Sequence, residues 1–255
     1  MKKIKLILEY DGTAYHGWQI QKEGLTIQGI IEEKIFKITD SHTRVIGASR
    51  TDAGVHALGQ TAVFRTESKL NVETIKKALD ALLPEDIRVL DTFEVDDSFH
   101  PRNDAKRKSY FYVISNQRKS SVFVNRYSWT VKQPLEFRSM INAAQTLIGR
   151  HDFSSFMGTD SDIKDAVREI FSLNIERLEE INFMTACIKG DFIKIQIEAD
   201  GFLRHMARNI VGTLVEIARG RISPHRVQDI LRSCDRRLAG QNAPSNGLFL
   251  EKIIY

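Results

Sequence analysis

Residues 43–66 read TRVIGASRTDAGVHALGQTAVFRT and place a single carboxylate, Asp52, between two β-rich runs. The runs at about 43–50 and 59–66 are rich in β-branched and apolar residues, so they predict two strands. A side chain in the connection between two strands is held by a rigid sheet and stays open to a ligand. Arg50 lies close enough to favour the ionised carboxylate, which suits a nucleophile or a proton acceptor. Because Asp and Gly are also common in plain hairpins, a solvated turn is the alternative.

Working outward from this stretch, the hydrophobic pattern predicts the order β-α-β-β-α-β, the split βαβ arrangement, followed by a less regular α/β half. We therefore expect two halves, residues 1–104 and 105–255. In the first half we expect a strand at 3–10, a helix at 26–38 capped by Thr26, strands at about 43–50 and 59–66, a helix at 72–83 capped by Asn71, and a strand at 86–95. In the second half we expect a strand at 106–116, a helix at 135–149, a strand near 167–177, a hairpin at 182–200 that turns at Lys189-Gly190-Asp191, helices at 203–219 and 224–234, and a strand at 248–254.

The composition is that of an ordinary soluble protein, with 42% hydrophobic and 27% charged residues in 255. The apolar run near the N-terminus is short and meets Glu9 and Asp11, so it predicts a strand rather than a signal peptide. No apolar window is long enough to span a membrane, so we expect a cytoplasmic protein. The two cysteines, Cys187 and Cys234, are far apart, and the seven histidines lack an H-E-x-x-H spacing. Neither pattern supports a metal site or a disulfide framework.

The net charge of +4 hints only mildly at an anionic partner, but the charge is unevenly distributed. Residues 201–240 hold eight arginines, no lysine and three acids, and a second basic cluster, Lys106-Arg107-Lys108, is echoed by Arg118-Lys119. Arginine matches phosphate oxygens with its planar fork, although basic clusters are often just solvated faces. Arg204 and Arg208 fall one turn apart on the expected helix at 203–219, where snorkelling surface arginines are the alternative.

Several short motifs follow one another along the chain: Tyr10-Asp11-Gly12-Thr13 with Gly17-Trp18-Gln19, Arg50-Thr51-Asp52-Ala53-Gly54-Val55-His56-Ala57, Phe99-His100, Lys106-Arg107-Lys108-Ser109-Tyr110, Asp152-Phe153-Ser154-Ser155-Phe156, His205-Met206-Ala207-Arg208-Asn209-Ile210-Val211-Gly212, and Gly247-Leu248. In this order and over nearly the whole chain, they resemble the tRNA pseudouridine synthase A family. One such motif is a weak signal, whereas several separate blocks in the right order are a strong one.

The resemblance implies the pseudouridine synthase fold, an α/β (α+β) fold with two ferredoxin-like halves and a mostly antiparallel mixed sheet around a central cleft. It implies that Asp52 is the catalytic residue, that Tyr110 stacks near the target base and that Arg208 supports the aspartate, while Arg50 is a second candidate for that support. Substrate binding is expected of Tyr110, Lys106, Arg107, Lys108, Arg204 and Leu248. The family is homodimeric, needs no cofactor or metal, and modifies uridines 38, 39 and 40 in the anticodon arm of tRNA.

The chain departs from the family at Ser49, where the family usually has Gly, at Ala207, where it has Val, and in the segment 157–161. These departures leave the chemistry intact but leave open which tRNA sites are modified, as in a divergent paralogue. Trp18 is expected to pack or to anchor a loop rather than to stack on a base. A catalytically idle tRNA-binding module of the same fold is one alternative.

A phosphatase of the haloacid dehalogenase type is the other alternative. The expected first strand runs into Glu9-Tyr10-Asp11-Gly12-Thr13, which resembles the D-x-D-G-T motif of those enzymes. Glu9 stands where they carry the nucleophilic aspartate. Its longer side chain would be wrongly placed for in-line attack on phosphorus, which makes this the weaker alternative.

Overall fold

The computed structural model describes residues 1–159, 163 and 165–255, which fold into two compact units. Unit 1 comprises Met1–Lys106 and Phe249–Tyr255, and unit 2 comprises Arg107–Leu248. The sequence assigned the whole last strand to the second half, whereas Phe249 pairs in parallel with His56 of unit 1. This pairing joins residues far apart in the chain, so a local sequence pattern does not predict it.

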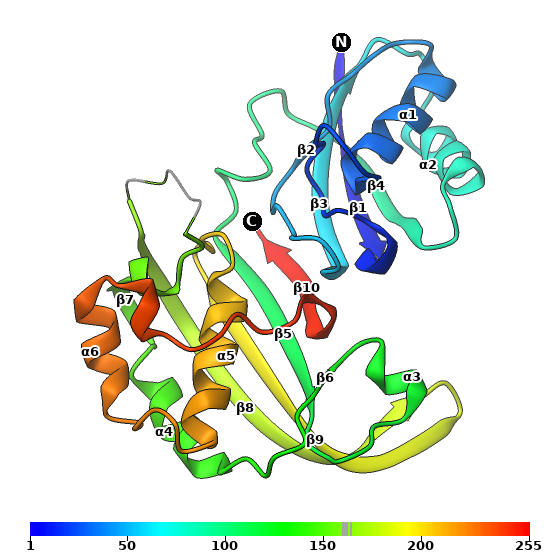
Figure 1. Cartoon of the computed structure of the whole chain (residues 1–255). Helices are drawn as coiled ribbons and strands as arrows, with labels where there is room; N and C mark the ends of the chain where they lie inside the picture. The colour runs from blue at the N-terminus through cyan, green and yellow to red at the C-terminus, as the bar shows by residue number, and fades with distance from the viewer. Residues whose placement is uncertain (160–162, 164) are drawn as a thin grey trace. The chain divides into compact units, whose positions relative to one another are not determined.

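Unit 1 follows the predicted order β-α-β-β-α-β. Its strands lie in the order β4-β1-β3, β2 pairs antiparallel with the later part of β3, and β10 pairs in parallel with the start of β3. Figure 1 shows α1 and α2 side by side on one face of these strands, as in a ferredoxin-like half. The elements are β1 (Lys2–Tyr10), the 3₁₀ turn η1 (Gly12–Ala14), α1 (Ile27–Thr39), β2 (Ile46–Gly47), β3 (His56–Thr66), α2 (Val72–Leu82), β4 (Ile87–Val95) and β10 (Leu248–Ile254).

Both helices of unit 1 begin where the sequence predicts. Thr26 Oγ1 accepts from the amide of Gly29 over 3.3 Å, and Asn71 Oδ1 accepts from the amide of Thr74 over 2.8 Å. Each cap satisfies an amide that the first helical turn leaves without a partner. The two predicted caps are therefore confirmed.

The expected strand at 43–50 is wrong in extent, because β2 contains only Ile46–Gly47. Side chains bind the backbone groups on either side of it. Glu32 Oε1 accepts from the amide of Val45 over 2.8 Å, and Gln60 binds both backbone groups of Ser49. Backbone groups that bond to side chains in this way are not available to a strand ladder.

Unit 2 has the strand order β5-β9-β8-β7 with antiparallel pairs, and β6 pairs in parallel with β5. Helices α4 and α5 pack on each other, α4 also packs on β8, and α6 lies near β7 (Figure 1). Helix α5 is buried over nearly its whole surface. The elements are β5 (Arg107–Ser115), α3 (Val122–Asn125), β6 (Trp129–Thr130), α4 (Phe137–Gln145), β7 (Gly149–Asp152), β8 (Val167–Phe183), β9 (Ala186–Ala199), α5 (Met206–Ala218) and α6 (Arg226–Ser233). This mixed α/β arrangement with mostly antiparallel strands confirms the predicted fold class.

The turn of the long hairpin differs from the prediction. Phe183 pairs with Ala186, so the chain reverses at Met184 and Thr185 rather than at 189–191. Gly190 lies inside β9, where a Cβ would come within 2.7 Å of Phe192 Cζ. The glycine that suggested a turn therefore permits close packing within a strand.

Other differences are smaller. The helix expected at 135–149 ends at Gln145, and the helix expected at 203–219 begins only at Met206. The elements α3, β6 and β7 are too short to carry a periodicity and were not predicted. Of the departing segment 157–161, residues 160 and 161 lie outside the described residues. None of the described helices has the length and hydropathy needed to cross a bilayer.

Candidate active site

Asp52 begins a tight turn between β2 and β3. The amide of Val55 donates to the carbonyl oxygen of Asp52 over 3.1 Å and closes the turn. Gly54 has a φ of +77°, in the left-handed region that glycine enters without steric cost. The Asp52 side chain is half-buried. Its predicted position in the connection between two strands is confirmed.

The backbone just before Asp52 is held by a buried group that we call the Gln60 clamp, made of Tyr10, Ser49, Thr51 and Gln60. Gln60 Oε1 accepts from the amide of Ser49 over 3.1 Å, and Gln60 Nε2 donates to the carbonyl of Ser49 over 2.7 Å. The hydroxyls of Tyr10 and Thr51 lie 2.8 Å apart. Burial raises the pKa of Tyr10, so its hydroxyl stays neutral and keeps its proton. Since both backbone groups of Ser49 are satisfied in a dry site, the chain has one favoured path into the turn.

A second segment supports the turn from the other side. The amide of Trp18 donates to the carbonyl of Thr51 over 3.0 Å, and the amide of Gly54 donates to the carbonyl of Tyr15 over 3.3 Å. Trp18 is fully buried, and its indole packs against Gly47 of β2. The expectation that Trp18 packs and anchors a loop is therefore confirmed.

Two glycines allow this close approach. Gly17 has a φ of +90°, and a Cβ there would lie 2.7 Å from the carbonyl oxygen of Thr51. A Cβ on Gly12 would lie 2.1 Å from the carbonyl oxygen of Val55. Any other residue at either position would push the turn that carries Asp52 out of place.

Arg102 is a residue of this region that the sequence analysis missed. It is half-buried, and its Nη2 donates weakly to the carbonyl of Gly47 over 3.4 Å. Burial, and then the positive charge of the nearby Arg50, lower the pKa of Arg102. Two positive charges that act on each other in this way favour an anion at this part of unit 1. The available signal was the position of Arg102 directly after the Phe99-His100 block.

In unit 2, Tyr110 lies in β5 and Arg208 lies in α5. Tyr110, in β5, is buried and packs edge-on against Phe202, with ring centroids 4.8 Å apart. Tyr112 follows two positions later and therefore points to the same face. Burial raises the pKa of Tyr112, and the positive charge of Arg208 opposes that rise. Arg208 Nε also donates to the carbonyl of Ala243 over 2.7 Å.

The basic cluster at 106–108 is not a uniform exposed surface. Lys106 and Arg107 are exposed, but Lys108 is only 7% exposed. Arg107 pairs with Glu198 over 2.9 Å and lies over the ring of Phe171 at 4.6 Å. Lys106 precedes β5, and Arg107 and Lys108 are adjacent in the strand, so the side chains of these two point to opposite faces of the sheet.

Most arginines of the 201–240 cluster have structural partners. Four of them pair with carboxylates: Arg219 and Arg221 with Glu216, Arg226 with Asp229, and Arg237 with Asp235. Arg236 donates to the carbonyl of Gly240 over 2.8 Å and to Asn209 Oδ1 over 2.8 Å. The local surplus of arginine is thus largely used inside unit 2, which the charge count could not reveal.

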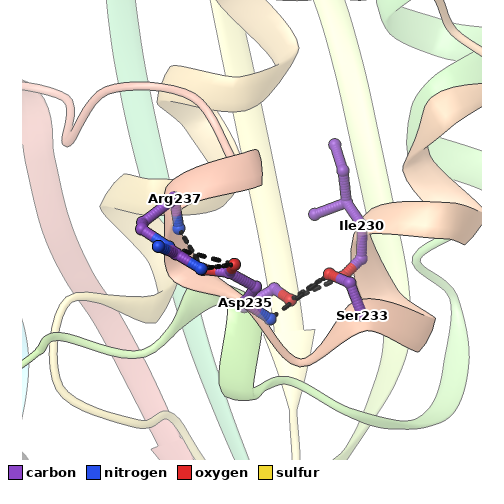
Figure 2. A network of polar contacts seen from close by, with 5 residues as sticks. Ile230, Ser233, Asp235 and Arg237 are labelled. Carbon is purple, nitrogen blue, oxygen red and sulfur yellow. Dashed lines mark hydrogen bonds and ion pairs between the residues drawn. The ribbon is translucent and has the colours of Figure 1, made fainter.

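Figure 2 shows the Asp235–Arg237 pair beside the end of α6. Ser233 Oγ donates to the carbonyl of Ile230 over 2.8 Å and accepts from the amide of Asp235 over 3.2 Å. Arg237 holds the pKa of Asp235 at about 2. This network ends the helix and orders the turn after it, which is a structural role.

Arg204 and Leu248 lie in different surroundings. Arg204 is exposed and precedes α5, because the chain turns at His205, which has a φ of +64°. The expectation that Arg204 and Arg208 lie one turn apart on the same helix is therefore wrong, because α5 contains only Arg208. Leu248 begins β10 and is buried.

Asp11, the second acid of the stretch that resembles the phosphatase motif, has a structural role. Its Oδ1 accepts from the amide of Thr13 over 2.9 Å and lies 3.0 Å from His56 Nδ1. It thereby caps η1, the turn that precedes the segment with Tyr15 and Trp18. In the described part of the chain, no group of three or more His, Cys, Asp or Glu is arranged to hold a metal ion.

The mixed α/β fold with mostly antiparallel strands is that of the pseudouridine synthases. The family model described as "tRNA pseudouridine synthase" matches residues 6–104 and 143–255. The chain is 45% identical to tRNA pseudouridine synthase A of Thermodesulfovibrio yellowstonii and 45% identical to that of Thermoanaerobacter pseudethanolicus, over 255 residues and 100% of each chain. The enzyme of the same name from Acetivibrio thermocellus is 42% identical over 100% of both chains.

The chain belongs to the tRNA pseudouridine synthase A family. The resemblance found in the sequence motifs is confirmed, and the phosphatase alternative is wrong.

Proposed function

We propose that this isomerase converts uridine to pseudouridine at positions 38, 39 and/or 40 in the anticodon stem-loop of tRNA. Membership of the family supports a tRNA pseudouridine synthase. The observation that carries the assignment of the catalytic residue is the turn of Asp52, held on one side by the Gln60 clamp and on the other by Trp18. Catalytic groups need this kind of rigid support.

The chemistry needs one carboxylate. Breaking the C1′–N1 bond of uridine builds positive charge at C1′, or forms a glycal if the 2′ proton leaves. Asp52 acts there as nucleophile, as charge stabiliser or as the base that takes the 2′ proton. The detached uracil turns, C5 bonds to C1′, and the C5 proton is released to solvent. Since no water attacks the sugar, the second carboxylate of a glycosidase has no counterpart.

The remaining residues serve the uracil and the charge of Asp52. Tyr110 offers its ring as a flat wall for the detached base, and its hydroxyl assists removal of the C5 proton. Arg208 and Arg50 are the two candidates to support the carboxylate. The tie of Arg208 to Ala243 supports a fixed role for its guanidinium.

The outer contacts are to phosphates. The target nucleotide must leave its stack, which costs a few kcal/mol. We assign the compensating phosphate contacts to Lys106, Arg107, Arg204 and the Arg50–Arg102 pair, all of which are exposed or half-buried. Lys108 and Leu248 are buried, so we assign their contacts to the extruded nucleotide. Affinity for tRNA should then fall steeply as salt rises, and a flat salt response would contradict these assignments.

Tritium release from tRNA labelled at uracil C5 tests the proposed sites. We expect release from a transcript with uridine at 38, 39 or 40, and none from a transcript with cytidine at all three. Release from the cytidine transcript would place the modified uridine elsewhere. We also propose that the protein is cytoplasmic and forms a homodimer. Sedimentation at micromolar concentration tests the dimer.

A further inference from the structure

The segment 116–135 of unit 2 is basic throughout. It contains four cations and no Asp or Glu, although the chain as a whole holds 33 acids. The cations are Arg118, Lys119, Arg126 and Lys132, and all four are exposed. The segment therefore carries as much net positive charge as the entire protein. An anionic partner is favoured wherever this surface lies open.

Helix α3 presents apolar side chains in the middle of this segment. Val122 is 79% exposed and Phe123 is 58% exposed, while Val124 is buried. The short helix is held from inside, since Ser121 accepts from the amide of Asn125 over 2.9 Å and Ser128 Oγ donates to the carbonyl of Val124 over 2.9 Å. The exposed ring of Phe123 is thus displayed on a fixed support rather than on a free loop.

The tip of the β8–β9 hairpin completes the surface. Phe183, the last residue of β8, stacks on Phe123 with ring centroids 5.2 Å apart and an interplanar angle of 26°. Figure 1 shows α3 beside this end of the hairpin. Met184, at the turn, is 89% exposed. We call this surface the aromatic-basic patch and define it by Arg118, Lys119, Phe123, Arg126, Phe183 and Met184.

We propose that the aromatic-basic patch docks the tRNA substrate outside the uridine that is isomerised. An unpaired base stacks on the exposed ring of Phe123, and Arg118 and Lys119 contact the flanking phosphates. Exposed aromatics set among cations bind single-stranded RNA by this combination of stacking and charge. The inference rests on the proposed function, because it takes the substrate to be tRNA.

The charge of the patch argues against a second copy of this chain as its occupant. A two-fold interface would bring the same patch of both copies together. Arg118, Lys119 and Arg126 of the two copies would then repel one another. The exposed Glu179 and Glu180 of β8 would offset this repulsion only in part, because the cations outnumber them. RNA, with one charge per nucleotide, is complementary to the same surface.

Two substitutions of Phe123 distinguish stacking from plain apolar contact. Phe123→Leu keeps an apolar side chain but removes the flat ring, so tRNA affinity should fall roughly tenfold, whereas Phe123→Trp should retain it. The kcat for tritium release at saturating tRNA should be unchanged in both variants, because the patch is not part of the chemistry. Leu25→Ala, at an exposed leucine of unit 1, is the control and should leave affinity unchanged.

The charges are tested by the salt dependence of tRNA binding. Arg118→Gln combined with Lys119→Gln should reduce the slope of log affinity against log salt by about 2. The matched pair Lys69→Gln and Lys77→Gln, at exposed lysines of unit 1, should leave the slope unchanged.

The proposal is overturned if Phe123→Leu binds tRNA as the wild type does. It is also overturned if the patch variants alter sedimentation but not affinity, which would indicate a protein interface instead. Tritium release by the wild type tests the proposed function independently of the docking surface. A protein that releases no tritium but whose tRNA affinity follows the Phe123 series would lose the proposed function and keep the docking surface.

Discussion

The Gln60 clamp leads to a prediction that links stability to catalysis. Gln60→Leu keeps the approximate volume of a fully buried side chain but removes both hydrogen bonds to the backbone of Ser49. Each backbone group left unsatisfied in a buried site costs about 1–3 kcal/mol, so the two cost roughly 2–6 kcal/mol if the chain stays in place. The chain relieves part of this cost by moving toward water, and this movement displaces Asp52, three residues further on.

We therefore expect Gln60→Leu to lose about 2 kcal/mol of unfolding free energy, measured by urea denaturation, and to remain folded at 25 °C. A misplacement of a catalytic group by about 1 Å costs roughly 100-fold in rate. Tritium release should accordingly show a kcat lowered by about that factor with KM little changed. The split between kcat and KM separates a displaced Asp52 from weakened tRNA binding.

Thr92→Val is the matched control, because it removes a hydrogen bond of another buried side chain of unit 1. Thr92 Oγ1 donates to the carbonyl of Val72 over 3.2 Å, away from the clamp. It should cost about 1 kcal/mol of stability and leave kcat unchanged. If Gln60→Leu loses stability but keeps kcat within twofold of the wild type, the clamp does not position Asp52.

Two further predictions concern backbone strain and pH. Gly17→Ala should lower kcat more than tenfold, because the added Cβ would meet the carbonyl of Thr51. Gly220 also has a positive φ, +74°, but no described atom lies within 4 Å of an added Cβ, so Gly220→Ala should lower the free energy of unfolding by about 1 kcal/mol and leave kcat unchanged. Equal kcat values for the two variants would contradict the clash. Arg237 lowers the pKa of Asp235 from 3.8 to about 2, so the stabilisation by this pair is complete above pH 3.8 and lost as pH falls through about 2. Urea midpoints between about pH 5 and pH 2 should therefore fall less in Asp235→Asn than in the wild type, and equal slopes would contradict the pairing.

Local chemistry made much of unit 1 predictable. The caps Thr26 and Asn71 each bind an amide of the first helical turn, an interaction that depends only on neighbours in the sequence. The alternating burial of β1 likewise follows from the two-residue period of a strand. The position of Asp52 between two strands followed from the same kind of pattern.

Features that depend on partners distant in the sequence could not be predicted. The extent of β2 depends on the side chains of Glu32 and Gln60, which bind the backbone on either side of it. The hairpin turn was placed at Gly190 because glycine signals a turn locally, while its actual role is to make room for Phe192. Arg102 was missed because its burial and its interaction with the charge of Arg50 both depend on the fold.

The arginine cluster shows the limit of counting charges. Its surplus suggested a phosphate surface, but Glu216 alone pairs with two of its arginines. The acid-free segment 116–135 has the same density of cations, four in 20 residues against eight in 40, but only Arg118 and Lys119 are adjacent in it. Phe123 of this segment stacks on Phe183, 60 residues further along the chain, and such a contact depends on the fold.

The central claim is that the carboxylate of Asp52 acts on the ribose of the target uridine. Tritium release from tRNA labelled at uracil C5, compared between the wild type and Asp52→Asn at equal tRNA occupancy, tests it most directly. We expect the wild type to release tritium and the variant, which binds tRNA with similar affinity, to release none above background. Release by Asp52→Asn at the wild-type rate would contradict the claim, and an absence of release from the wild type with every tRNA would leave the idle RNA-binding module as the correct description.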